Sequence, residues 1–453
     1  MPSEVDVLPL ESRREIDLRA YQGLLRSGAA PLVQGRLAEV VGLVLEAVGC
    51  KASVGDLFEI RSRAGQTAVQ AEVIGLRGNR TLLMPLGSTQ GLQIGTPLRR
   101  VGNAAMVGVG PALLGRVVDA LGRPLDGQSP PLFTEALPLF GVPRNPLRRR
   151  AVQEPLRVGV RAIDGPLTLA RGQRIGIFAG GGVGKSSLLG MMIRRTEADV
   201  AVVALIGERG REVEEFVNRT LGPQGMQRAV VVAATSAEPP LVRARGALYA
   251  TTIAEYFRAK GLNVLLVMDS ATRYAMALRE IGLAAGEPAT TKGYTPSVFA
   301  ALPQLLERAG TSAGAGSITG IYTVLVEGDD LSDPIADAAR AILDGHIVLS
   351  RKLAERGHFP AIDVAQSISR VMSHVVARSH LECAQQIREL LGAYREAEDL
   401  LSIGVYKRGA LPRLDTALDR MPRLEAFLRQ RDEENPPASI EEEMQKIWSA
   451  SHG

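Results

Sequence analysis

A glycine-rich run at residues 176–192, GIFAGGGVGKSSLLGMM, contains residue types that can bind phosphate. The pattern of a phosphate-binding loop is glycine, four residues, then Gly-Lys-Ser or Gly-Lys-Thr. Gly184, Lys185 and Ser186 satisfy the end of this pattern, whereas Ala179 stands where the first glycine is expected. A methyl group there is compatible with the loop if the backbone keeps a negative φ, because the glycines that follow supply the conformational freedom.

In such a loop, backbone N–H groups and the first turn of a helix face the phosphates of a nucleoside triphosphate. The run predicts a helix that begins near Lys185, whose ammonium group would reach the β- and γ-phosphates, while the Ser186 hydroxyl would bind Mg²⁺. A flexible glycine turn without a nucleotide is the alternative, and the order of strand, loop, Lys-Ser and helix disfavours it. The expected nucleotide-binding residues here are Gly180, Gly181, Gly182, Val183, Gly184, Lys185, Ser186 and Ser187.

Two more charged positions directly follow apolar runs. Asp269 ends the run NVLLVMD, and a carboxylate at the carboxyl end of a buried parallel strand is placed to assist Mg²⁺. Glu208 and Arg209 follow VAVVALIG, and hydrolysis needs a group that orients the attacking water. We therefore expect Glu208 to activate water, with a surface carboxylate as the alternative. The glutamates that follow in REVEEF are expected to form a solvated helix face.

The elements that must position these residues follow from the pattern of apolar runs. Strand-like runs such as RIGIFAG, AVVVAAT and ITGIYTVLVEG alternate with helical segments, which predicts a parallel, doubly wound α/β domain with a phosphate-binding loop. Short β-branched runs with glycine turns precede it and predict a small β-barrel. We expect a helical leader for partner docking, or a loosely ordered segment, at 1–31, the barrel at 32–100, the nucleotide-binding domain at 101–372 and a helical domain at 373–453.

The composition of the 453 residues excludes several classes of protein. An apolar content of 45% and a charged content of 23% are typical of soluble proteins, and a net charge of +4 does not by itself indicate nucleic acid. Phe58 is the only aromatic residue between Tyr21 and Phe133, so the barrel lacks the stacking platforms of a nucleic-acid-binding domain. The N-terminus does not resemble a signal peptide, and no apolar run approaches the roughly 18 to 20 residues that cross a bilayer. The two cysteines indicate a reducing, cytosolic compartment, and no histidine or cysteine cluster indicates a metal site.

The order AGGGVGKSS, GERGRE, LLVMDSATRYA and GYTPSVFAALPQLLERAG resembles the hexameric rotary-ATPase family of RecA-like motors over roughly residues 33–430. Within that family the chain is most similar to the type III export ATPases, flagellar and injectisome, which commonly carry alanine at the first position of the loop. Further similar segments are DALGRPLDG, LRVGVRAIDG, EGDDLSDPIADAARAILDGHIVLSR and GHFPAIDVAQSISRVM. The resemblance implies a RecA-like domain flanked by an N-terminal β-barrel and a C-terminal helical domain.

The resemblance also implies roles for individual residues. Glu208 matches the catalytic glutamate, Phe359 the aromatic residue against adenine, and Arg370 the arginine finger that reaches the γ-phosphate of the neighbouring subunit. A structural salt bridge is the alternative for Arg370. The expected catalytic residues are thus Lys185, Glu208, Arg209 and Arg370, the expected metal ligands Ser186 and Asp269, and the expected cofactors ATP and Mg²⁺.

The presence of Glu208 and Arg370 in one chain implies a ring of identical subunits, each serving its own site and that of its neighbour. We expect a homohexamer that energises type III protein export, with the flagellar system slightly preferred. The resemblance further implies a central stalk protein, a stator or regulator at the N-terminus, and export substrates and chaperones at the C-terminal helices. It places the ring in the cytoplasm, peripheral to the inner membrane and not embedded in it.

Three alternatives remain at this point. The catalytic subunit of a rotary ATP synthase carries an acidic segment in its helical domain, whereas LLSIGVYKRGALPRLDTALDRM has no acid cluster and contains Lys407 and Arg408. An RNA-translocating ring would need a nucleic-acid-binding barrel. A subunit that does not hydrolyse nucleotide would be expected to lack Glu208.

Overall fold

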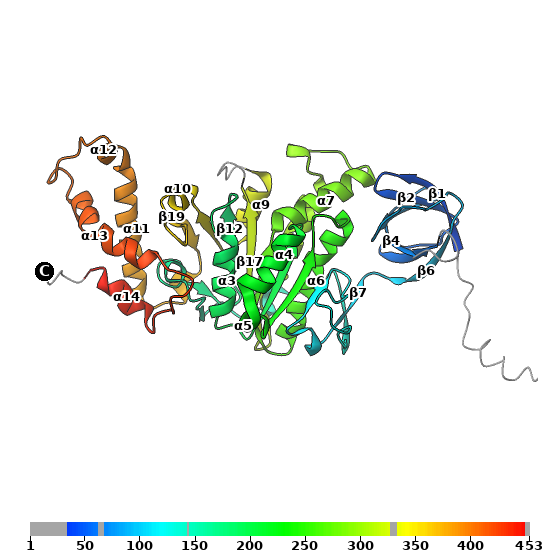
Figure 1. Ribbon diagram of the computed structural model, residues 1–453, viewed down its shortest axis with the longest axis horizontal. Coiled ribbons are helices and arrows are strands. Elements are labelled where there is room, and N and C mark those ends of the chain that lie inside the picture. Colours follow the sequence, from blue (N-terminus) through cyan, green and yellow to red (C-terminus); the bar gives the residue numbers. More distant parts are fainter. Residues whose placement is uncertain (1–33, 62–67, 143–144, 327–332, 449–453) are drawn as a thin grey trace, which may run out of the picture.

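The computed structural model describes residues 34–448 with the exception of 62–67, 143–144 and 327–332. The chain is elongated, with a β-barrel at one end, a central α/β region and a group of helices at the other end (Figure 1). The helical leader expected at residues 1–31 lies outside the described residues. In the part of the chain that is described, no helix is long and apolar enough to cross a membrane.

The N-terminal strands form a closed barrel in the order β1-β2-β5-β4-β3-β6, which confirms the predicted fold of this region. Alternating apolar residues such as Leu45, Phe58 and Leu83 fill its interior. The barrel strands are β1 (Gln34–Val41), β2 (Val44–Val48), β3 (Asp56–Ile60), β4 (Val69–Arg77), β5 (Arg80–Pro85) and β6 (Pro97–Asn103).

The central region contains a sheet in the order β19-β18-β12-β17-β15-β13-β14-β8, with β16 paired to β17. Its inner strands are parallel, whereas β19 pairs with β18 and β16 with β17 in antiparallel fashion. The nearly continuous burial of these strands explains their apolar runs, because helices cover both faces. The strands are β8 (Val117–Asp119), β12 (Arg174–Ala179), β13 (Val200–Ile206), β14 (Ala229–Ala234), β15 (Asn263–Asp269), β16 (Gly310–Thr311), β17 (Ser317–Leu325), β18 (Gly345–Leu349) and β19 (Ile362–Ser369).

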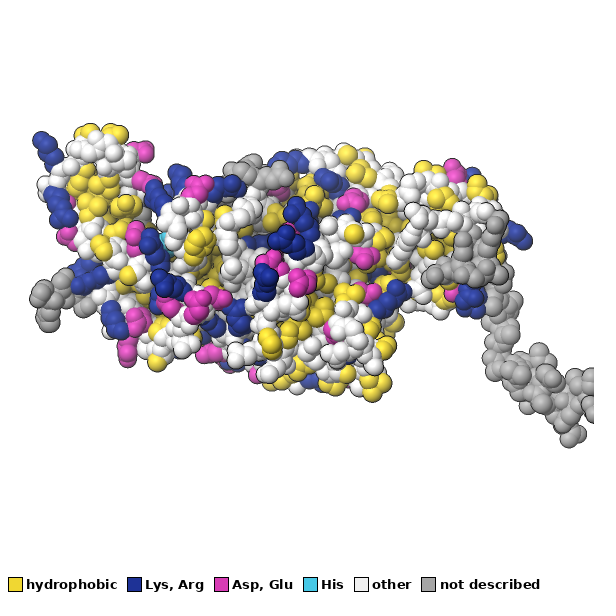
Figure 2. Space-filling view, viewed as in Figure 1, with side chains coloured by type: hydrophobic (Ala, Val, Ile, Leu, Met, Phe, Trp, Pro, Cys, Tyr) yellow, Lys and Arg dark blue, Asp and Glu magenta, His cyan; other side chains and the backbone are white. Residues whose placement is uncertain are grey.

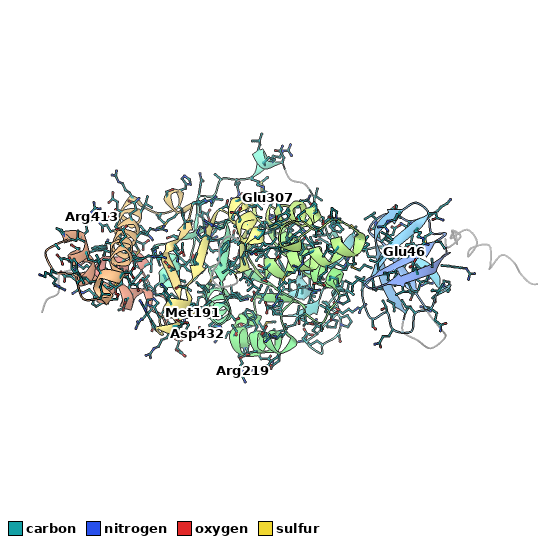
Figure 3. The ribbon with its side chains drawn as sticks, turned by 90° about the horizontal axis from the view of Figure 1, so that it is seen from above. Glu46, Met191, Arg219, Glu307, Arg413 and Asp432 are labelled. Atoms are coloured by element: carbon teal, nitrogen blue, oxygen red, sulfur yellow. The ribbon has the colours of Figure 1, made fainter. Side chains whose placement is uncertain are left out.

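Helices pack on the two faces of this sheet in separate apolar cores. One core contains residues of α6 (Pro240–Ala259), α7 (Ala271–Ala285), α8 (Pro296–Leu306) and α9 (Pro334–Ile342). The other contains residues of α2 (Arg161–Asp164) and α3 (Lys185–Arg195), together with the turns of α4 (Gly210–Glu215), the π-helical segment η3 (Phe216–Leu221) and α5 (Gly222–Met226). Accordingly, Met191 of α3 and Glu307, which follows α8, lie on opposite sides of the central region (Figure 3).

The C-terminal part of the described chain is helical, as predicted, and no strand follows β19 there. Buried residues of α11, α13 and α14 belong to the same apolar core as α2 and α3, so these helices rest directly on the nucleotide-binding region. They are α11 (Arg378–Glu396), α12 (Glu398–Ser402), α13 (Pro412–Leu428) and α14 (Ile440–Lys446), and α10 (Arg351–Glu355) lies between β18 and β19 in the chain.

Short elements complete the described chain. Two-stranded sheets join β7 (Met106–Val109) to β9 (Glu135–Pro138) and β10 (Pro155–Leu156) to β11 (Leu169–Ala170). Short 3₁₀ turns are η1 (Pro111–Leu113), η2 (Pro146–Arg148), η4 (Thr291–Gly293) and η6 (Met372–His374). On the surface seen in Figure 2, basic and acidic side chains are intermixed over the central region, in keeping with the small net charge.

Candidate active site

The glycine-rich loop joins the end of β12 to the start of α3, and the helix begins at Lys185 as predicted. Gly182 and Gly184 have φ values of 76° and 84°, a region that only glycine adopts without strain. A Cβ atom at Gly181 or Gly182 would meet no atom within 4 Å, so open space lies beside the loop. Ala179 is buried as the last residue of β12 and has no positive φ, which explains why a methyl group is tolerated there.

Lys185 lies between two carboxylates at the carboxyl edge of the sheet. Its Nζ is 2.5 Å from Oδ1 of Asp269 and 3.7 Å from Oε1 of Glu208. Asp269 ends β15 and Glu208 follows the adjacent strand β13, so the parallel pairing of these strands brings the two acids to one place. Thr323 of β17 donates a 2.7 Å hydrogen bond to the same Asp269 oxygen, which fixes the carboxylate. The structure thus brings together the three residues predicted from separate motifs.

Glu208 has an altered acidity in this cluster. Burial, the nearby Asp269 charge and a hydrogen bond with Glu212 together raise its pKa to about 7, although the Lys185 charge acts to lower it. Glu212 also accepts the Arg209 backbone N–H at the start of α4, at 3.3 Å, so it does not merely face solvent as the sequence suggested. A carboxylate with a pKa near neutrality is suited to general base catalysis.

The oxygen donors near Lys185 fit the expected Mg²⁺. Ser186 is exposed in the first turn of α3 beside Lys185, and Asp269 contacts Lys185 directly. Mg²⁺ is bound in nucleotide sites by one or two protein oxygens together with phosphate oxygens and water, so this sparse donor set is sufficient. Bound there, the ion would neutralise charge on the transferred phosphoryl group.

Phe359 lies next to the phosphate-binding loop. A Cβ atom at Gly184 would lie 3.3 Å from two carbons of its ring, and 46% of the Phe359 residue is exposed. The backbone N–H of Gln430 donates a 2.9 Å hydrogen bond to the Phe359 carbonyl, which ties this segment to the residues after α13. A partly exposed ring beside a phosphate loop is available to stack on a base.

The structure does not bring the two remaining predicted residues into the cluster. The Arg209 side chain is 84% exposed and lies 3.6 Å from Glu212. Arg370 follows β19, and its backbone N–H bonds to the carbonyl of Asp344, whose own N–H bonds to the carbonyl of Arg174 at the start of β12. The phosphate loop follows the other end of β12, so a strand of six residues, roughly 16 Å at the usual rise, separates the two places.

Sequence reasoning missed Arg273, although the segment LLVMDSATRYA contains it. It lies in the first turn of α7, four residues after Asp269, and its side chain packs within 3.2 Å of the Cβ position of Gly207, directly before Glu208. Its Nε is buried and has no hydrogen-bond partner among the described residues. Its position four residues after Asp269 was the sequence signal that could have identified it. A side chain in the first turn of a helix points back toward the strand end that precedes the helix.

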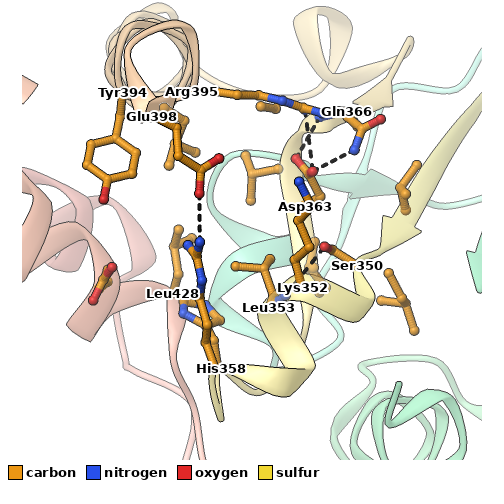
Figure 4. A pocket seen from close by; sticks show the side chains of 18 of the residues that line it. Ser350, Lys352, Leu353, His358, Asp363, Gln366, Tyr394, Arg395, Glu398 and Leu428 are labelled. Atoms are coloured by element: carbon orange, nitrogen blue, oxygen red, sulfur yellow. Dashed lines mark hydrogen bonds and ion pairs between the residues drawn. The ribbon is translucent and has the colours of Figure 1, made fainter. Parts of the chain in front are cut away.

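A cavity of about 320 Å³ lies between α10 and β19 on one side and α11, α12 and α13 on the other (Figure 4). Apolar residues such as Leu353 and Leu428 line it, and Arg356 and Asp363 form ion pairs across it with Glu398 and Arg395. None of the phosphate-loop or charged-cluster residues lines this cavity, so it is separate from the candidate active site.

Three segments of the chain match known protein families. Residues 37–102 match the beta-barrel domain of the ATP synthase alpha/beta family, and residues 159–369 match its nucleotide-binding domain. Residues 376–447 match the C-terminal domain of the type III secretion ATPase EscN. The last match favours the export branch over the ATP synthase itself, because its family model is that of a type III secretion ATPase. It includes the segment that lacks an acid cluster.

Whole-length relatives agree with these matches. The chain is 53% identical to a flagellum-specific ATP synthase of Pseudomonas aeruginosa over 91% of this chain and 92% of the relative. It is 50% identical to a type 3 secretion system ATPase of Xanthomonas euvesicatoria, over 87% and 89% of the two chains. The solved structure of the assembled ATPase EscN from enteropathogenic E. coli superposes with a TM-score of 0.86 at 45% identity and covers 91% of this chain and 99% of that one. The chain therefore belongs to the family of flagellum-specific ATP synthases and type 3 secretion system ATPases, a branch of the ATP synthase alpha/beta family.

Proposed function

We propose that the protein is a Mg²⁺-dependent ATP hydrolase that works as a homohexameric ring and energises protein export through a type III apparatus. The observation that carries this proposal is the division of the catalytic residues between two ends of one sheet. Lys185, Glu208 and Asp269 meet beside the phosphate loop, while Arg370 is exposed at the far end. A head-to-tail ring joins such different faces and would complete each site with the Arg370 of the next subunit.

Within a site, each group has a distinct role. Lys185 and the loop N–H groups would bind the triphosphate, Ser186 and Asp269 would hold Mg²⁺, and Glu208 would orient and deprotonate the attacking water. Phe359 would stack on the adenine ring. Arg209 and Arg273 are close enough along the chain to this edge to stabilise phosphate charge, once a nucleotide draws their side chains inward.

The proposed partners follow from relatives. EscN has been solved in complex with its central stalk EscO, and that structure superposes on this chain with a TM-score of 0.83. We infer a comparable stalk for this protein, a regulator at the N-terminal leader, and export substrates and chaperones at the C-terminal helices, without nucleic acid. We place the ring in the cytoplasm, peripheral to the inner membrane. The identities to flagellar and secretion relatives overlap. Our slight preference for the flagellar system rests on the sequence segments GRLAEVVGLVLEAVG, GPALLGRVVDALG and VEGDD.

The decisive experiment is the specific ATPase activity of the purified chain as a function of its own concentration, with Mg²⁺ and without partners. We expect a steep rise, because sites become complete only between subunits. A full rate in a verified monomer would contradict the ring proposal. Absence of activity at every concentration would indicate that another subunit supplies half of each site, as in the ATP synthase.

A further inference from the structure

Arg370 contacts the backbone of residues 340–344, which form the C-terminal end of α9 and the two residues after it. Its guanidinium lies 3.4 Å from the carbonyl oxygens of both Arg340 and Leu343, and its backbone N–H donates a 3.0 Å hydrogen bond to the carbonyl of Asp344. The last carbonyls of a helix carry partial negative charge and attract a cation. Helix α9 therefore presents its C-terminal end to the guanidinium of the proposed finger.

These contacts restrain Arg370 without neutralising it. Both guanidinium contacts are at the long end of the hydrogen-bond range, and the residue is exposed. In the described part of the chain, the Arg370 guanidinium bonds to backbone carbonyls and forms no ion pair with a carboxylate. A guanidinium held in place but not paired with an acid is available to a phosphate that a neighbouring subunit brings to this face.

The segment that holds Arg370 is itself anchored by the side chain of Asp344. Its carboxylate accepts hydrogen bonds from the Arg174 backbone N–H at 2.9 Å and from Nε and Nη2 of the Arg174 side chain at 3.1 Å each. Arg174 begins β12, and Glu307 contacts it from the other side. The carboxylate thus joins the end of α9 to the start of a central strand, a rigid part of the sheet.

We propose that Asp344 is a positioning residue for the arginine finger. Its carboxylate fixes the backbone of residues 340–344 on β12, and the carbonyls of Arg340, Leu343 and Asp344 in turn set the place from which Arg370 reaches the next subunit. Asp344 lies roughly 16 Å, one strand length, from the phosphate loop of its own chain, so its effect on turnover passes through Arg370. The inference rests on the proposed role of Arg370.

The test is a double-mutant cycle of Asp344→Asn and Arg370→Ala in the full-length chain, with Asp337→Asn as the matched control. Asp337 is an exposed aspartate of α9. We expect Asp344→Asn to lower kcat at least about ten-fold with Mg²⁺-nucleotide affinity and ring mass unchanged, and Asp337→Asn to change neither. In the Arg370→Ala background, Asp344→Asn should have no further effect, because the residue through which it acts is gone.

Each other outcome has a defined meaning. An undiminished effect of Asp344→Asn in the Arg370→Ala background, or a parallel loss of nucleotide affinity, would overturn the positioning role in favour of a purely structural one. A normal kcat of Arg370→Ala alone would instead remove the finger from the proposed function. If Asp344→Asn fails to fold, Arg174→Lys replaces it in the test. Lysine keeps the positive charge but cannot make the bidentate hydrogen bonds to Asp344. The same dependence of its effect on Arg370 is expected.

Discussion

At the scale of single residues, acids shielded from solvent serve two purposes: some belong to the candidate active site, and others stabilise the fold. Lys185 compensates two carboxylates at the candidate site, so its loss would leave the buried Asp269 and the half-buried Glu208 without this cation. Asp164 is a buried acid of a different kind. It accepts the backbone N–H groups of Val158 and Gly159 at 2.9 and 2.8 Å and so shapes the turn before α2.

The acidity of Asp164 predicts how stability depends on pH. Burial raises its pKa to about 7, although the two N–H groups and Arg157 act to lower it. Between about pH 4 and pH 7 the folded protein then keeps a proton that the unfolded chain has lost, so this residue makes stability fall as pH rises through that window. Thermal unfolding midpoints measured from pH 5 to pH 8 should fall for the unchanged chain relative to Asp164→Asn, with exposed Asp337→Asn as control. A constant difference between the two curves would show that the N–H groups keep Asp164 ionised.

Sequence patterns could predict which residues lie at the ends of strands. They could not predict in which direction the side chains of the following residues point. Lys185, Glu208 and Asp269 were identifiable because each stands at a fixed distance from an apolar run. The outward direction of Arg209 was not, since it depends on the capping of α4 by Glu212. Arg273 was missed because its place beside Glu208 depends on packing against Gly207, which no sequence pattern records.

At the scale of elements, the β-barrel is joined to the central region by a buried ion pair. Arg245 of α6 lies 2.9 Å from Glu72 of β4, both side chains are 7% exposed, and the same Arg245 nitrogen also reaches the carbonyl of Ala104. Neither residue belongs to a recognisable motif, and the two are separated by 173 positions in the sequence. Sequence analysis therefore could not predict this pair. The barrel itself was predictable because its strands are local and separated by glycine turns.

This ion pair predicts an asymmetric response to substitution. Arg245→Met would leave Glu72 buried without a partner and should destabilise the protein by roughly 3–5 kcal/mol, whereas adding Glu72→Leu should recover most of the loss. Denaturant unfolding of the two variants measures the difference. The matched control is Lys260→Met, which breaks the exposed pair with Glu135 and should cost far less, because water screens that pair. Equal losses for Arg245→Met and Lys260→Met would contradict the assignment.

At the scale of the whole molecule, the residues of the proposed active site lie at opposite edges of one sheet. The carboxyl edge of the sheet holds the phosphate loop and Glu208, and the opposite edge presents Arg370. The resemblance to ring-forming relatives suggested this division, and the strand directions give it a physical basis. How neighbouring subunits face one another is beyond what one chain specifies, because the contacts form only in the assembly.

The proposed division predicts complementation between two variants that each have little activity alone. A site in the mixed ring works only if its own subunit has Glu208 and the next subunit has Arg370. Randomly mixed Glu208→Gln and Arg370→Ala subunits should therefore regain about a quarter of the unchanged activity, although each alone keeps only a small residual rate. Rings mixed from unchanged subunits and the double variant provide the control, and they should also give about a quarter if the sites are shared.

The comparison of the two mixtures separates shared from self-contained sites. If Arg370 acted within its own chain, the two single variants would show no recovery, while the mixture with the double variant would keep about half of the activity. Equal activities in the two mixtures are thus the expected result, whatever fraction of subunits assembles, provided that ring mass shows the same assembly in both. The measurement depends on the ratio of two rates, so a general loss of activity on mixing affects both and leaves the conclusion intact.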